Sequence, residues 1–177
     1  MRTLVLGMGN PYVADDSVGL RLAAALRGLL EGLPGVDWAT DCAAGGLELL
    51  DILAGHQRLL VFDAIRTRGG RPGDWHRFDA SALRETRHLG SIHDANFATA
   101  LELGRALGMD LPADDEIHIF AVEIQDNETF SESLSPPLQA AWPVYSSGIL
   151  EEAAKLLEGS PARPTPWPPE EGTRPHA

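Results

Sequence analysis

The chain has little cysteine, no long apolar run and few basic residues. Cys42 is its single cysteine, which excludes an internal disulfide and a cysteine-rich zinc site and fits a reducing compartment. No stretch approaches the roughly 20 apolar residues of a membrane span, and the N-terminal residues lack the pattern of a secretion signal. These absences predict a cytoplasmic protein without a membrane anchor.

The shortage of basic residues restricts the partners. The chain has 14 Lys and Arg against 26 Asp and Glu, which gives a formal net charge of −12. This charge repels phosphate backbones and anionic lipid, so we expect neither nucleic acid nor membrane as a partner. Proteins and small molecules are favoured instead. The length of 177 residues fits one domain with a substantial core.

Short apolar runs alternate with segments of helical periodicity along the first 158 residues. A helix of about 16 residues is predicted from Val18, by its apolar spacing. The other predicted helices are 46–54, 95–107 and 136–157, and the predicted strands are 4–6, 36–42, 59–65, 116–124 and an edge strand at 75–78. This alternation predicts an α/β fold with a parallel sheet between helices.

Three further expectations concern particular segments. In the 95–107 helix, Ala98, Leu101 and Leu103 are expected to point inward, and Pro143 should kink the 136–157 helix. Residues 80–94 have no clean period. Residues 159–177 hold six prolines and almost no aliphatic residue, so they cannot offset their ordering entropy by burial. We therefore predict one α/β domain over 1–158 and a disordered proline-rich tail.

Aspartates follow the apolar runs, where open α/β sheets bind their ligands. Asp15 and Asp16 come after the first run, Asp41 ends the second, and Asp63 interrupts the third. A carboxylate inside a buried strand costs several kcal/mol unless it is paired, protonated or bound to a metal. The structural alternatives stay open: Asp63 as an acceptor of backbone hydrogen bonds, and the others as helix caps.

His93 precedes a predicted helix, where a histidine is often a solvated loop residue. Together with two carboxylates, however, its imidazole would suit a borderline divalent metal such as nickel or zinc. Gly7-x-Gly9 resembles the start of a dinucleotide fingerprint, but Tyr12 occupies the place of the third glycine. Spacing by itself leaves open whether the candidate residues converge.

Read together, these pieces resemble the hydrogenase maturation peptidase family, which processes the large subunits of nickel–iron hydrogenases. The matching segments are LVLGMGN at 4–10, DDSVG at 15–19, DCAAGGLELL at 41–50, FDAI at 62–65, His93, and LSP at 134–136. The resemblance spans residues 1 to 157 and leaves out the tail. It departs from the family pattern at Ser17 and at Cys42-Ala43, which bears on substrate preference.

The resemblance implies a twisted, five-stranded sheet between helices in a three-layer α/β/α fold. It also implies that Asp16, Asp63 and His93 engage nickel carried by the hydrogenase large-subunit precursor while its C-terminal extension is removed. Asp16 or Asp63 would act as a general base, with metal activation of the water as the alternative. Asp41, on the same sheet edge, is expected to serve catalysis.

Two other functions fit parts of the pattern. A nickel-binding assembly chaperone would hold the precursor without cutting it, since a ligand set alone does not demonstrate hydrolysis. The segment 7–12 also resembles the opening of peptidyl-tRNA hydrolases. That family's catalytic histidine would be expected where this chain has Asp15 and Asp16, and the acidic charge opposes tRNA binding.

Overall fold

A five-stranded sheet forms the centre of the molecule. The computed structural model describes residues 1–42, 47–85 and 92–159, with the side chains of 41, 42, 47, 84, 85 and 92–96 left out. The strands are β1 (Thr3–Met8), β2 (Val36–Cys42), β3 (Arg58–Ile65), β4 (Trp75–Asp79) and β5 (Ile117–Glu123), in the order β2-β1-β3-β5-β4. All pairs are parallel except β4 with β5, so the predicted edge strand is confirmed as an antiparallel edge.

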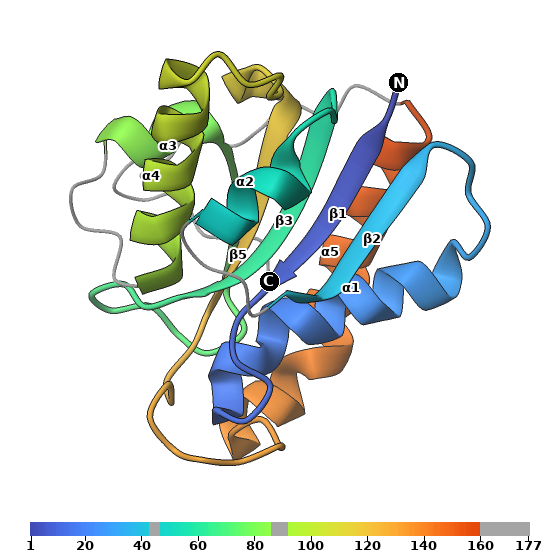
Figure 1. The fold of residues 1–177 in the computed structure, drawn as a ribbon. Coiled ribbons are helices and arrows are strands. Elements are labelled where there is room, and N and C mark those ends of the chain that lie inside the picture. The colour runs from blue at the N-terminus through green and yellow to red at the C-terminus, as the bar shows by residue number, and fades with distance from the viewer. Residues whose placement is uncertain (43–46, 86–91, 160–177) are drawn as a thin grey trace.

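Helices cover both faces of this sheet (Figure 1). α1 (Val18–Leu29) and α5 (Pro136–Leu157) lie on one face, whereas α2 (Leu47–Leu53), α3 (Ala80–Glu85) and α4 (Ile92–Ala106) lie on the other. Two 3-10 turns, η1 (Ala14–Ser17) and η2 (Asp114–Glu116), precede α1 and β5. The predicted three-layer α/β/α architecture is therefore confirmed.

Strand alternation divides the apolar residues between two cores. Leu59 and Val61 of β3 pack with α2, α3 and α4, while Leu60 and Phe62 pack with α1 and α5. Phe62 stacks on a phenylalanine of β5 with ring centroids 5.2 Å apart. Both faces of the central strands are thus buried, which explains why these strands read as continuous apolar runs and not as alternating ones.

Some helix predictions were wrong in detail. α1 has 12 residues, not about 16, and ends at Leu29. Leu103 was expected to point inward but is 39% exposed, because the buried face of α4 runs through Phe97 and Leu101. α3 lies in a segment without a clean period. α5 contains Pro143 within one helix, Pro136–Leu157, and the kink expected at Pro143 stays a prediction. The predicted tail, beyond Gly159, lies outside the described residues.

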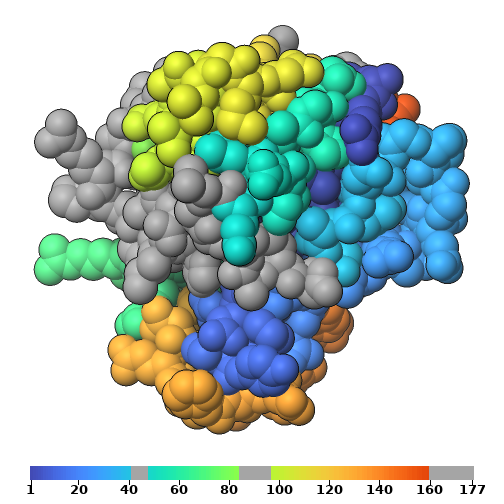
Figure 2. All heavy atoms as spheres, viewed as in Figure 1, coloured from blue at the N-terminus to red at the C-terminus, as the bar shows by residue number. Residues whose placement is uncertain are grey.

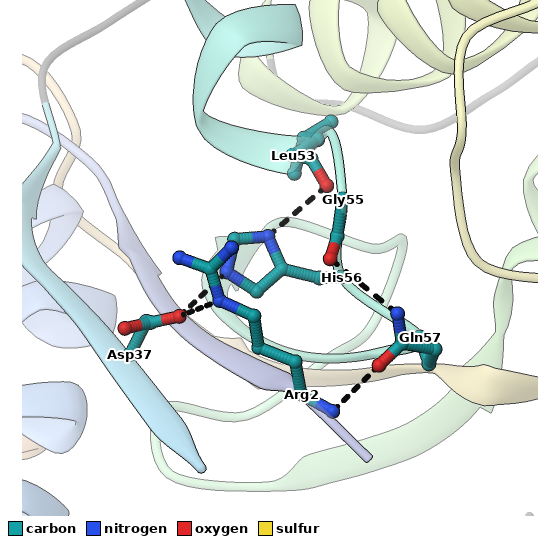
Figure 3. Close-up of polar contacts among 6 residues, drawn as sticks. All are labelled: Arg2, Asp37, Leu53, Gly55, His56 and Gln57. Carbon is teal, nitrogen blue, oxygen red and sulfur yellow. Dashed lines mark hydrogen bonds and ion pairs between the residues drawn. The ribbon is translucent and has the colours of Figure 1, made fainter.

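A small polar cluster closes the amino edge of the sheet (Figure 3). Asp37 Oδ2 lies 2.7 Å from Arg2 Nε and 3.0 Å from His56 Nε2, and the other ring nitrogen of His56 lies 3.2 Å from the Leu53 carbonyl oxygen. The hydrogen bonds from His56 and Arg2 hold the pKa of Asp37 below its usual value. This cluster fastens β1 and β2 at the end opposite the candidate site.

Among the described residues, no helix has the length and apolar character to cross a membrane.

Candidate active site

The loop after β1 brings Asp16 back onto the end of that strand. Gly9 has a φ of +133°, and a Cβ there would lie 1.9 Å from the Asp16 carbonyl oxygen, so only glycine fits this turn. The Asn10 amide donates a 2.7 Å hydrogen bond to Asp16 Oδ2. The half-buried carboxylate of Asp16 is therefore held at the carboxyl end of β1.

The start of α1 lies directly on the ends of β1 and β3. A Cβ on Gly19 would approach the carbonyl oxygens of Phe62 and Met8 to 2.3 and 2.5 Å. Because Gly7 pairs with Phe62 across the two parallel strands, the next residue, Asp63, lies at the same sheet edge as η1, which contacts β3. Neighbouring strands lie about 5 Å apart. The fold therefore brings the backbones of Asp16 and Asp63 to neighbouring positions.

Asp63 is a buried carboxylate within β3. Its side chain is 2% exposed, and Oδ1 accepts a 2.8 Å hydrogen bond from the Ala64 amide. By strand alternation it shares the sheet face of Val61 and Ile65, which α2, α3 and α4 cover. The hydrogen bond accounts for part of the stabilisation that a buried carboxylate requires, and this was the structural reading of Asp63 in the sequence.

The backbones of Asp41 and His93 lie at the same edge of the sheet. β2 runs parallel to β1 with Met8 opposite Cys42, so Asp41 lies at the carboxyl end of β2. α4 carries His93 in its first turn and runs opposite to β5 in Figure 1. Its C-terminal end lies at the amino edge, where the Gly55 amide donates to the Asp110 carbonyl. Both side chains lie outside those described, so the convergence of His93 with Asp16 and Asp63, and the catalytic part of Asp41, stay predictions.

The described side chains at this edge do not form a complete metal site by themselves. Among the side chains that the structure describes, no three of His, Cys, Asp and Glu stand close enough to hold a metal ion. Asp16 and Asp63 are the predicted metal-engaging residues within that part of the chain. A further ligand would have to come from a side chain such as that of His93 or from a bound partner.

Asp15 has a structural role that its sequence position did not reveal. The side chain is fully buried, and its carboxylate accepts hydrogen bonds from the Asp126 amide at 3.0 Å and from the Ser135 amide and hydroxyl at 2.6 and 2.8 Å. The Gln125 amide adds a longer contact of 3.3 Å. Asp15 therefore connects η1 to the loop 124–135 and to the residue that precedes α5, and is not merely a helix cap.

The loop 124–135 is ordered by its own hydrogen bonds as well. Asp126 Oδ1 accepts from the amides of Glu128 and Thr129 at 3.1 and 2.9 Å, and these bonds, chiefly that from Thr129, lower the pKa of Asp126. The Ser131 amide donates to the Tyr12 carbonyl at 3.0 Å. The loop after β1 and the loop 124–135, more than a hundred residues apart in sequence, thus lie against each other next to Asp16. They are the adjoining blue and orange surfaces in Figure 2.

Glu123 is a third buried carboxylate, besides Asp15 and Asp63, and it was not among the residues predicted from the sequence. It is 1% exposed and accepts hydrogen bonds from the Thr67 amide, at 3.0 Å, and hydroxyl. His76 Nε2 lies 3.4 Å from Glu123 Oε1, and Gly70 lies against the carboxylate. Glu123 therefore anchors the loop that follows β3. The signal was available, because Glu123 lies near the end of the predicted strand 116–124, as Asp41 lies near the end of the predicted strand 36–42.

Comparisons with known proteins agree with this fold. The model of a family described as hydrogenase maturation protease matches residues 39–152. The hydrogenase 2 maturation protease of Escherichia coli is 37% identical over 73 residues, which span 41% of this chain and 44% of that protein, less than half of its length. The hydrogenase expression/formation protein HupD of Rhizobium leguminosarum bv. viciae is 27% identical over 88% of this chain and 74% of its own.

A solved structure extends the likeness to nearly the whole domain. The hydrogenase maturating endopeptidase HybD from E. coli superposes with a TM-score of 0.71 at 25% identity, and covers 93% of this chain and 98% of its own.

Proposed function

Because this chain belongs to the hydrogenase maturation protease family, we propose that it is an endopeptidase that removes the C-terminal extension of a nickel–iron hydrogenase large-subunit precursor. The observation that carries the proposal is the family match over residues 39–152. Cleavage would follow nickel insertion, so that the metal in the precursor reports a correctly assembled cofactor. The partner is then the precursor itself, and nickel enters the site as part of the substrate.

We assign recognition of the nickel-loaded precursor to Asp16, Asp63 and His93. Carboxylate and imidazole are suitable ligands for such a borderline divalent ion. The tight turn at Gly9 and the contact of Gly19 with β3 support the pairing of the two carboxylates at one edge. A site held on strand ends and an adjacent helix start is rigid, as precise positioning of a scissile bond requires.

The chemistry proposed is aspartic. A carboxylate of Asp16, Asp63 or Asp41 takes a proton from water as the water oxygen attacks the scissile carbonyl carbon. The proton then passes to the leaving amine as the carbon–nitrogen bond breaks, so the carboxylate is regenerated. Activation of the water by the substrate's nickel is the alternative route.

Mass spectrometry of a purified precursor tests the proposal. The protein is incubated with nickel-loaded and with nickel-free large-subunit precursor from the same organism. We expect loss of a C-terminal peptide from the nickel-loaded form alone. Asp16→Asn, Asp63→Asn and His93→Ala should each abolish the loss, whereas Asp51→Asn, at an exposed carboxylate on α2, should retain it.

Two other outcomes separate the competing functions. Binding of the nickel-loaded precursor without any mass change would identify a non-cleaving assembly chaperone. Equal cleavage of both precursor forms would refute recognition through nickel but leave the endopeptidase assignment intact.

A further inference from the structure

Two aromatic side chains project into solvent beside the candidate site. Tyr12, in the loop after β1, is 61% exposed, and Phe130, in the loop 124–135, is 86% exposed. Both rings leave most of their apolar surface in water, although a ring of this kind can bury roughly 150 to 250 Å². Exposed apolar surface that adjoins a candidate site is typical of a protein-binding surface.

Both residues lie on an ordered backbone. A backbone bridge pairs Val13 with Phe130. The Ser131 amide donates a 3.0 Å hydrogen bond to the Tyr12 carbonyl. The buried carboxylate of Asp15 joins the same two loops, because it accepts hydrogen bonds from backbone amides of the second loop. Since these bonds already fix the two loops, a partner that docks on them loses little affinity to loop ordering.

Asn10 connects this surface to the candidate site. Its amide donates a 2.7 Å hydrogen bond to Asp16 Oδ2, and its side-chain oxygen accepts a 3.0 Å hydrogen bond from the Tyr12 amide. Val13 directly precedes η1, which carries Asp16. In Figure 2 the two loops adjoin on one face of the molecule. A protein held by Tyr12 and Phe130 therefore also lies next to the Asp16 carboxylate.

The shape of this surface favours a folded partner over an extended peptide. A ring that is 86% exposed, like that of Phe130, projects outward and forms no wall around a bound group. Extended peptides bind in grooves or along strand edges. A folded protein, in contrast, can offer a pocket that receives a projecting aromatic ring.

Acidic side chains border the ring of Phe130. Glu128 and Glu132 are both exposed, and each lies two positions from Phe130 in the sequence. The whole chain has a net charge of −12. Because opposite charges face each other across protein interfaces, the partner surface that fits here is apolar at its centre and basic at its border.

We propose that Tyr12 and Phe130 form a docking surface for the folded body of the precursor, separate from the contacts to nickel and to the cleaved bond. The precursor offers an apolar pocket bordered by Lys or Arg side chains. This inference rests on the proposed function and names the surface by which the same substrate is held. Docking keeps the scissile bond near Asp16 and takes no part in the chemistry.

Replacing the rings by serine tests the inference. Tyr12→Ser and Phe130→Ser remove exposed apolar surface and leave the backbone hydrogen bonds in place, so Tm should equal that of the wild type. We expect each change to raise the Kd for the nickel-loaded precursor about 10-fold or more, as for aromatic residues at the centre of an interface. Biolayer interferometry measures this Kd. The cleavage rate at saturating precursor should stay that of the wild type, because only binding is weakened.

A matched control lies on another part of the surface. Leu107 is 65% exposed and follows α4, whose C-terminal end lies at the amino edge of the sheet. Leu107→Ser also removes exposed apolar surface, so it should bind the precursor like the wild type. Equal affinity of the wild type, Leu107→Ser and Phe130→Ser would overturn the docking surface.

The charged border has its own test. Glu128→Gln combined with Glu132→Gln should slow association with the precursor and make the association rate less dependent on salt. A salt dependence equal to that of the wild type would overturn the basic border of the partner surface.

Two other occupants of the rings are tested directly. If a synthetic peptide with the sequence of the C-terminal extension binds the wild type but not Phe130→Ser, the extension occupies the rings, and the inference is overturned. Sedimentation of the protein alone tests for a second copy. A dimer that Phe130→Ser abolishes, with precursor affinity unchanged, would overturn the inference as well. Failure of the wild type to cleave any precursor would instead refute the proposed function, while the measured affinities would still test the docking surface.

Discussion

Replacing Asp15 by alanine should destabilise the protein far more than the same change at Asp16, although the two residues are adjacent. Asp15 is fully buried and its carboxylate accepts hydrogen bonds from Asp126 and Ser135, more than a hundred residues away. Asp16 is half-buried and accepts from Asn10, which is exposed and can bond to water instead. The alanine pair therefore compares a buried structural acceptor with a carboxylate at the candidate site.

The magnitude follows from the donors that the change leaves unpaired. The amides of Asp126 and Ser135 are fixed by the backbone, and each loses its acceptor at a cost of about 1 to 3 kcal/mol. The Ser135 hydroxyl can rotate and the Gln125 contact is long, so they add little. We expect a loss of about 2 to 6 kcal/mol for Asp15→Ala and less than about 1 kcal/mol for Asp16→Ala.

Urea unfolding followed by circular dichroism measures both variants. For a chain of this length the loss at Asp15 corresponds to a fall in Tm of about 4 to 24 °C, with the urea midpoint shifted at a constant m-value. Ser135→Ala combined with Asp15→Ala should cost less than the two single changes together, because they remove the same contact. If Asp15→Ala and Asp16→Ala have the same Tm, the idea that Asp15 stabilises the fold by connecting η1 to the residue before α5 is refuted.

Three other predictions address the remaining charged groups and the tail. Asp41→Asn keeps the shape of the side chain and removes its charge, so it should cause a large loss of precursor cleavage with binding partly kept; unimpaired cleavage would make Asp41 a helix cap. Burial, with the charges of Arg77 and Arg58, lowers the pKa of His118 from 6.5 to about 4. Between pH 7 and pH 5 the unfolded chain therefore binds a proton at His118 that the folded chain does not bind, and the free energy of unfolding should fall by about 2 kcal/mol. In His118→Gln the urea midpoint should fall less over the same pH range. Deletion of the residues after Glu158 should leave Tm and processing nearly unchanged, and a truncated protein that unfolds or fails to cleave would show that the tail packs or recruits the precursor.

The local sequence pattern was sufficient for the elements of the fold. Continuous apolar runs predicted β1, β3 and β5 because strands buried on both faces need no polar alternation. Helical spacing of apolar residues located α1, α2 and α4, and Ser135-Pro136 marked the start of α5. The alternation of strands and helices predicted the layered sheet. The errors fell where local signals are weakest: the end of α1, the inward face of α4 at Leu103, and the short helix α3.

Only the tertiary structure determined the burial and the hydrogen-bond partners of the aspartates. Asp15 and Asp16 have the same local signal, and only the return of loop 124–135 separates a buried clamp from a half-buried carboxylate at the site edge. The strand order likewise places β3 beside β1, which brings Asp63 next to η1 although 47 positions separate it from Asp16. The physical reason is that hydrogen-bond partners and burial depend on chain segments distant in sequence, whereas periodicity reports only which face of an element is apolar.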